Sequence, residues 1–147
     1  MALKLLYLYV LLIKFGAIAM NATPTIGKRT NNRFQVLNCR VQLKSKGILG
    51  LFGKEIHQLS LIDLSAAGIQ VISPKKLNYQ KEYDIAILAP AFRHPISTKG
   101  CVIWNHPYIG TDNSQYYRVG LEFTYFKEIS MKRIQALESS PELRKLA

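Results

Sequence analysis

Two arginines near the start of the chain have the type and spacing to bind a phosphate-containing ligand. Arg29 and Arg33 form an R-x-x-x-R motif, and Lys28 precedes the first of them. A guanidinium group is planar and always charged, so it can donate two hydrogen bonds to phosphate oxygens or to the O6 and N7 edge of guanine. The motif predicts an anion clamp, although arginines at this spacing also occur by chance on solvated segments.

A second motif, D-x-S-x-x-G, is formed by Asp63, Ser65 and Gly68. A carboxylate such as that of Asp63 can accept hydrogen bonds from the N1–H and N2–H₂ donors of guanine, and the hydroxyl of Ser65 can contribute another. Gly68 suits a turn in which the backbone takes a positive φ or in which a ligand must approach closely. The same residues can also cap a turn, a role compatible with ligand binding.

Pro24, Gly27 and the polar run 30–32 predict an unstructured arm over residues 21–32, which carries the first motif up to Arg33. The two motifs, in this order on the arm and at a strand end, resemble those of the PilZ domain family. The stretch 119–123 is similar to the family's late G-x-x-F strand. The resemblance covers about residues 28–140 and implies a mainly β fold, a six-stranded antiparallel β-barrel with a C-terminal α-helix. It also implies a non-enzymatic cytoplasmic receptor for cyclic di-GMP (c-di-GMP), with no cofactor and no metal.

By this resemblance, Arg29 and Arg33 hold phosphate and guanine, while Asp63, Ser65 and Gly68 hold a guanine edge. Because the arm is loose in sequence, we predict that it becomes ordered on ligand binding and so presents a changed surface to a partner protein. The family is associated with motility, adhesion, exopolysaccharide production and virulence.

Two further residues are assigned to the site by the same resemblance. Lys28 occupies the position that influences whether one ligand or an intercalated pair binds. Trp104 matches a position at which some members stack an aromatic ring on guanine, although an aromatic side chain in a strand more often belongs to the core.

Alternation of apolar and polar residues predicts the strands that position these motifs. From Arg33 onward, Leu37, Cys39, Val41 and Leu43 alternate with polar residues, which is typical of a half-buried strand. Six short strands without intervening helices predict an antiparallel barrel or sandwich. The five later strands are expected at 55–64, 69–72, 83–88, 100–104 and 116–126, with turns at Pro90, Pro95, Pro107 and 110–113.

The end of the sequence changes to helical spacing. Ile129, Ile134 and Leu137, with Met131 nearby, fit one helical face, and Pro141 is expected to end the helix. The expected organisation is an apolar segment and flexible arm over 1–27, the barrel with its helix over 28–140, and a tail over 141–147.

The first twenty residues allow three interpretations. They have a basic residue near the start (Lys4), contain an apolar run that ends at Lys14, and include the small-residue triplet 17–19. They could be a signal peptide, a membrane anchor that makes the protein inner-membrane-associated, or sequence upstream of a start at Met20. Export would contradict a cytosolic ligand.

Positive charge is concentrated in the first third of the chain. The net charge is +11, and residues 1–54 contain nine Lys or Arg and no Asp or Glu. Such a field attracts phosphate, nucleic acid or anionic lipid, although a solvated basic face is the simpler explanation. Nucleic acid is not expected as a partner, because only Phe34 and Phe52 accompany the basic residues of 28–54.

The remaining alternatives concern partners and catalysis. A PilZ-like adaptor that binds a protein and no nucleotide is the first alternative, with the apolar segment 47–53 as a candidate partner-facing loop. Cys39 and Cys101 have no metal-ligand spacing and are expected to be reduced thiols. The three histidines have no nucleophile partner or metal spacing, so no enzymatic activity is expected.

Overall fold

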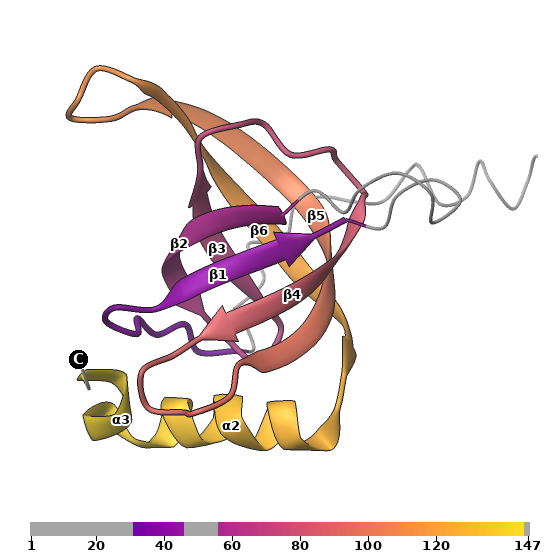
Figure 1. Cartoon of the computed structure of the whole chain (residues 1–147), viewed down its shortest axis with the longest axis vertical. Helices are drawn as coiled ribbons and strands as arrows, with labels where there is room; N and C mark the ends of the chain where they lie inside the picture. The colour runs from indigo at the N-terminus through magenta and orange to yellow at the C-terminus, as the bar shows by residue number, and fades with distance from the viewer. Residues whose placement is uncertain (1–30, 46–55, 146–147) are drawn as a thin grey trace, which may run out of the picture. The chain divides into compact units, whose positions relative to one another are not determined.

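The chain folds into a closed six-stranded β-barrel, seen in a computed structural model that describes residues 31–45 and 56–145. All neighbouring strands are antiparallel, and β1 pairs with both β2 and β4, so the sheet closes on itself (Figure 1). This confirms the expected barrel. Around the barrel the order is β1 (Arg40–Lys44), β2 (Ile56–Leu64), β3 (Gly68–Ser73), β6 (Gln115–Phe126), β5 (Ile96–Ile109) and β4 (Glu82–Leu88).

Strict alternation along β1 and β4 directs their apolar side chains into the barrel. Val41 and Leu43 of β1 are fully buried, and Ile85 and Ile87 of β4 are buried beside them. Their polar neighbours in sequence point to the outer face, because successive side chains of a strand alternate between the two faces. Each fully buried aliphatic side chain contributes about 1.5–3 kcal/mol to folding.

The first strand begins later than the alternation predicts. Asn38 has a φ of 53°, a left-handed conformation that interrupts extended backbone. Leu37, which was expected to point inward, is 55% exposed, whereas Phe34 and Val36 are buried. Phe34 forms an isolated antiparallel bridge with Leu64 at the end of β2, so the segment before β1 is held against that strand.

A long hairpin of β5 and β6 extends beyond the other strands (Figure 1). The predicted turn at Pro107 is wrong, because β5 continues through this residue, which pairs with Tyr117. Beyond Val102 the described strand pairs with β6 alone, and proline is tolerated where a strand lies at an edge. The expected turn over 110–113 is confirmed, with Asn113 at a φ of 64°.

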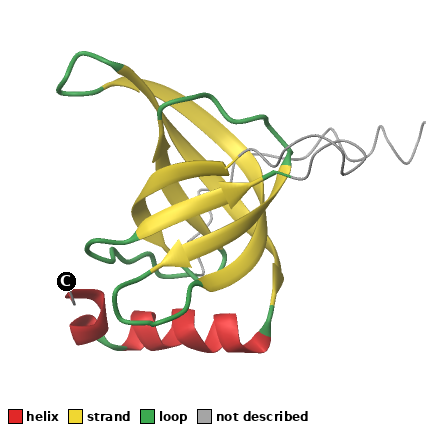
Figure 2. Ribbon diagram, viewed as in Figure 1, coloured by secondary structure: helices red, strands yellow, loops and turns green. Residues whose placement is uncertain are grey.

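Two helices follow the barrel (Figure 2). α2 (Glu128–Ser139) packs Ile134 and Leu137 into the core, as its spacing predicts. Ile129 was also expected on that face but is 55% exposed, and the buried residue of the first turn is Ser130, whose hydroxyl donates to the carbonyl of Ser97 at 2.7 Å. Pro141 follows the end of α2 as expected.

The segment after α2 forms a further helix, α3 (Pro141–Lys145), which the sequence did not predict. Proline is favoured at a first helical position, because its missing N–H has no partner there in any case. Arg144 joins α3 to the start of the described chain. Its carbonyl accepts a hydrogen bond from the amide of Leu37 at 2.9 Å, and its guanidinium lies 5.2 Å from the ring centre of Phe34.

Several expectations fall outside the described residues. These include the nature of the N-terminal segment 1–27, the positions of Lys28 and Arg29, and the loop 47–53. Neither α2 nor α3, the helices of the described chain, has the length and apolar character needed to cross a bilayer.

The two cysteines should differ strongly in reactivity. Burial raises the pKa of the Cys39 thiol to about 12, so at pH 8 only about one molecule in ten thousand carries the nucleophilic thiolate. Cys101 is only partly buried. In a thiol-labelling assay at pH 8, we expect Cys101 to react first and Cys39 to react only after unfolding. The Cys101→Ser variant should therefore show almost no native labelling, and rapid labelling of it would contradict the expectation.

Candidate functional site

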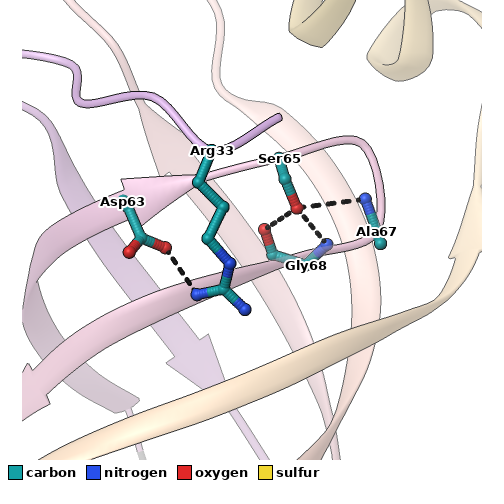
Figure 3. Close-up of polar contacts among 5 residues, drawn as sticks. All are labelled: Arg33, Asp63, Ser65, Ala67 and Gly68. Carbon is teal, nitrogen blue, oxygen red and sulfur yellow. Dashed lines mark hydrogen bonds and ion pairs between the residues drawn. The ribbon is translucent and has the colours of Figure 1, made fainter. Parts of the chain in front are cut away.

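An ion pair joins the arm to the end of β2. The guanidinium of Arg33 (Nη1) donates to the carboxylate of Asp63 (Oδ1) at 3.0 Å, and these side chains are 34% and 18% exposed (Figure 3). The bridge between Phe34 and Leu64 continues this contact along the backbone. The two sequence motifs, thirty residues apart, are thus in direct contact.

The turn after β2 is organised by Ser65. Its hydroxyl oxygen accepts hydrogen bonds from the amides of Ala67 at 3.3 Å and Gly68 at 3.2 Å, and the hydroxyl donates to the carbonyl of Gly68 at 3.3 Å (Figure 3). Ser65 is buried, at 4% exposure. Its donor and acceptor groups are therefore already used to fix the turn that follows Asp63.

Gly68 is required by a close approach of backbone to backbone. Its φ lies outside the left-handed region, so positive φ is not the reason for glycine here. A Cβ at this position would lie 2.2 Å from the carbonyl oxygen of Leu121 in β6, against which Gly68 packs. Glycine allows β3 to pair closely with β6 beside the motif.

Two polar residues extend the Arg33–Asp63 pair along the surface. Gln70 of β3 is 7% exposed, and with its amide nitrogen facing Asp63 it donates to that carboxylate (Oδ2) at 2.9 Å. Its amide oxygen then accepts from Arg118 of β6, from Nε at 3.0 Å and from Nη2 at 2.7 Å. The result is a continuous network of two guanidinium groups, a carboxylate and a carboxamide.

The same network continues toward an aromatic side chain. One row of paired residues crosses four strands. It runs from Asp63 in β2 through Gln70 in β3 and Gly120 in β6 to Trp104 in β5. The Trp104 ring covers Gly120, since a Cβ there would lie 2.2 Å from the indole nitrogen. Trp104 lies outside the described hydrophobic core, which corrects the core assignment favoured for an aromatic strand residue. Its ring is 5.3 Å from that of His106.

The structure therefore brings together most of the predicted site. Arg33 and Asp63 are paired, and Ser65 and Gly68 shape the adjoining turn. Lys28 and Arg29 lie outside the described residues. The predicted set of site residues omitted Gln70 and Arg118. Gln70 could have been suspected, because it is a polar residue in the otherwise apolar run 69–72, two positions after Gly68.

The network combines cationic donors, acceptors and a flat aromatic ring on one surface. Guanidinium groups suit phosphate oxygens, a carboxylate suits the donor edge of a purine, and an indole suits the face of a base. No group of three or more His, Cys, Asp or Glu side chains that could hold a metal ion is found among the described residues. Together these groups have the chemistry to bind an anionic ligand that carries a planar ring.

Solved structures with the same fold include several ligand complexes. The "PilZ domain with c-di-GMP of YcgR from Escherichia coli" matches with a TM-score of 0.56 and 16% identity, over 79% of this chain and 92% of that one. The K. pneumonia MrkH–c-di-GMP complex matches with a TM-score of 0.60 and 14% identity, over 78% and 52%. The Bacillus subtilis inhibitor of motility MotI/DgrA matches with a TM-score of 0.56 and 18% identity, over 83% and 55%.

These likenesses establish the fold, and the chain spans about half the length of the MrkH and MotI chains. None of the curated proteins compared matches the sequence. The family model described as "PilZ domain" matches residues 28–139, which include both motifs, the whole barrel and α2. By its barrel and by this match over most of its length, the chain belongs to the PilZ domain family.

Proposed function

We propose that the protein is a non-enzymatic receptor that binds c-di-GMP at the surface formed by Arg33, Asp63, Gln70, Arg118 and Trp104. The observation that carries this proposal is the network from Arg33 through Asp63 and Gln70 to Arg118, in the same row of strands as Trp104. It supplies guanidinium groups for phosphates, a carboxylate for a guanine edge and a ring for stacking. Lys28 and Arg29 are proposed to complete the site from the arm, while Ser65 and Gly68 position it.

Binding is proposed to exchange the partners of Arg33. The partly exposed pair with Asp63 uses one hydrogen bond of Arg33 and contributes about 0–1 kcal/mol. The planar guanidinium can instead donate two hydrogen bonds to a phosphate or a guanine edge. Arg33 can therefore leave Asp63 for a phosphate at a net gain, and Asp63 becomes available to the guanine donors. Four or five such bonds, reduced by the entropic cost of ordering the arm, give about −8 kcal/mol, which corresponds to micromolar affinity.

The proposed output is a rearranged arm that a partner protein recognises. Because c-di-GMP is an intracellular messenger, we place this activity in the bacterial cytoplasm. Motility, adhesion and exopolysaccharide production are the outputs that we propose for such a receptor; one similar structure is that of an inhibitor of motility.

Calorimetric titration of the full chain with c-di-GMP tests the proposal, with GTP and cyclic GMP as controls. We expect saturable binding at micromolar or lower concentration, and no comparable heat from the controls. Loss of binding in the Asp63→Ala variant would locate the site. If the folded protein shows no binding, the proposal is wrong, and the alternative function is that of an adaptor that recognises protein alone.

Replacing Gly120 by alanine should weaken c-di-GMP binding without unfolding the barrel. The added methyl group would meet the indole of Trp104, a side chain that can turn aside, rather than a strand backbone. Loss of base stacking costs about 1–3 kcal/mol, so we expect affinity to fall about tenfold or more. Trp104 is the single tryptophan of the chain, so its fluorescence reports the displacement directly. Unchanged affinity together with a displaced indole would remove Trp104 from the site.

A further inference from the structure

The outer wall of the barrel carries a hollow of about 430 Å³ that is separate from the Arg33–Asp63 network. It lies over β1, β4 and β5 and reaches the end of β6. Strand register builds it in two rows. The first row crosses all four strands and consists of Lys44, Asp84, Lys99 and Tyr125. The adjacent row crosses β1, β4 and β5 and consists of Gln42, Ala86 and Ser97. Ala86 has the smallest side chain of these seven, and it leaves the recess between them.

The hollow presents three positive charges around one negative charge. Lys44 and Lys99 flank Asp84 from the neighbouring strands, and Lys127 lines the hollow where β6 leads into α2. Within the described residues, none of these three ammonium groups has a carboxylate partner within ion-pair distance. Lys127 is also the N-cap residue of α2, and a helix N-terminus adds positive potential. The hollow therefore attracts anionic groups.

The order of the charges distinguishes among anionic partners. Neighbouring strands lie about 4.8 Å apart, so the row Lys44–Asp84–Lys99 places the Cα atoms of its two lysines about 10 Å apart, with the residue that carries the carboxylate between them. A polyphosphate would bring continuous negative charge against Asp84. An extended peptide places acidic side chains two residues apart on one face, about 7 Å from each other, within reach of two flexible lysines.

We propose that this hollow is a docking site for an acidic, extended segment of a partner protein. The three strands that form most of it are β1, β4 and β5, whereas Arg33, Asp63, Gln70 and Arg118 lie on the arm, β2, β3 and β6. Trp104 is also on β5, but it lies beyond the part of that strand that pairs with β4 and is paired with Gly120 of β6. Occupation of the hollow therefore leaves the proposed nucleotide surface open. The two sites can be occupied together, as a receptor that reports to a partner requires.

Backbone amide NMR shifts of the full chain test this site with a defined probe. The probe is a capped hexapeptide of alternating glutamate and glutamine, and the matched peptide contains glutamine alone. We expect the acidic peptide to shift the amides of Lys44, Ala86 and Lys99, and the all-glutamine peptide to leave them unchanged. Tripolyphosphate serves as the polyanion control. Tighter binding of tripolyphosphate at the hollow, or no peptide shift there at millimolar concentration, would overturn the proposal.

Charge-reversal variants separate a built site from general charge attraction. The Lys44→Glu/Lys99→Glu variant should weaken peptide binding on the order of tenfold. The Lys75→Glu/Lys76→Glu variant changes the net charge equally at exposed positions outside the hollow, and it should bind the peptide nearly as well as the wild type. Equal losses in both variants would show nonspecific attraction and refute the docking site. Titration of the same variants with c-di-GMP reports the nucleotide site independently.

Discussion

Replacing Arg33 by alanine should lower the affinity for c-di-GMP by at least about 100-fold while leaving the barrel folded. Two charge-assisted hydrogen bonds to a phosphate or guanine edge contribute about 3–6 kcal/mol together, and a 100-fold loss corresponds to about 2.7 kcal/mol. The effect on folding should be small, because the pair with Asp63 is partly exposed and contributes about 0–1 kcal/mol. Calorimetric titration and thermal unfolding measure the two effects separately.

Two further variants make the Arg33 result specific. Arg33→Lys keeps the charge but loses the planar fork, so it should retain part of the affinity. Arg93→Ala removes an exposed arginine from the loop between β4 and β5 and should bind normally. Affinity within threefold of the wild type in Arg33→Ala would exclude this residue from the site. A large fall in its melting temperature would show that the ion pair is structural instead.

Replacing Gly68 by alanine should destabilise the protein by about 3 kcal/mol or more, and so lower the melting temperature by roughly 10 °C. The new Cβ would lie 2.2 Å from the Leu121 carbonyl oxygen, 3.2 Å from its carbonyl carbon and 3.3 Å from the Cα of Glu122. All three atoms are backbone atoms of β6. The clash can therefore be relieved only if β3 separates from β6, and the pairing between Gly68 and Glu122 is then lost.

The Gly68 experiment needs a control in the same turn. Ala67→Gly removes one exposed methyl group from that turn and should cost no more than about 1 kcal/mol. At a temperature where Gly68→Ala remains folded, the free energy of c-di-GMP binding should change much less than the free energy of unfolding does. A melting temperature within 2 °C of the wild type would show that β6 accommodates the methyl group, and a ligand contact would then become the better reason for glycine.

The sequence predicted those parts of the fold that depend on local pattern. Alternation in β1 and β4, the turn over 110–113 and the inward face of α2 at Ile134 and Leu137 follow from side-chain periodicity. The site motifs were likewise recognisable, because Arg33, Asp63, Ser65 and Gly68 have characteristic spacing.

Features that depend on long-range register could not be predicted. Whether Gln70 meets Arg118 is decided by how β3 pairs with β6, and no local pattern contains that pairing. The left-handed conformation of Asn38 and the continuation of β5 through Pro107 depend on neighbouring chain in the same way. The hollow likewise depends on register, which places Ala86 between Gln42 and Ser97 on the adjacent strands.

The contact of Arg144 with Phe34 and Leu37 couples α3 to the segment that precedes β1. Thermodynamic linkage is reciprocal: a ligand that fixes the arm also holds α3 in place, and whatever pulls α3 away loosens the segment that carries Arg33. Trypsin cuts after arginine and lysine, so its rate of cleavage at Arg144 should report how firmly the segment before β1 is held.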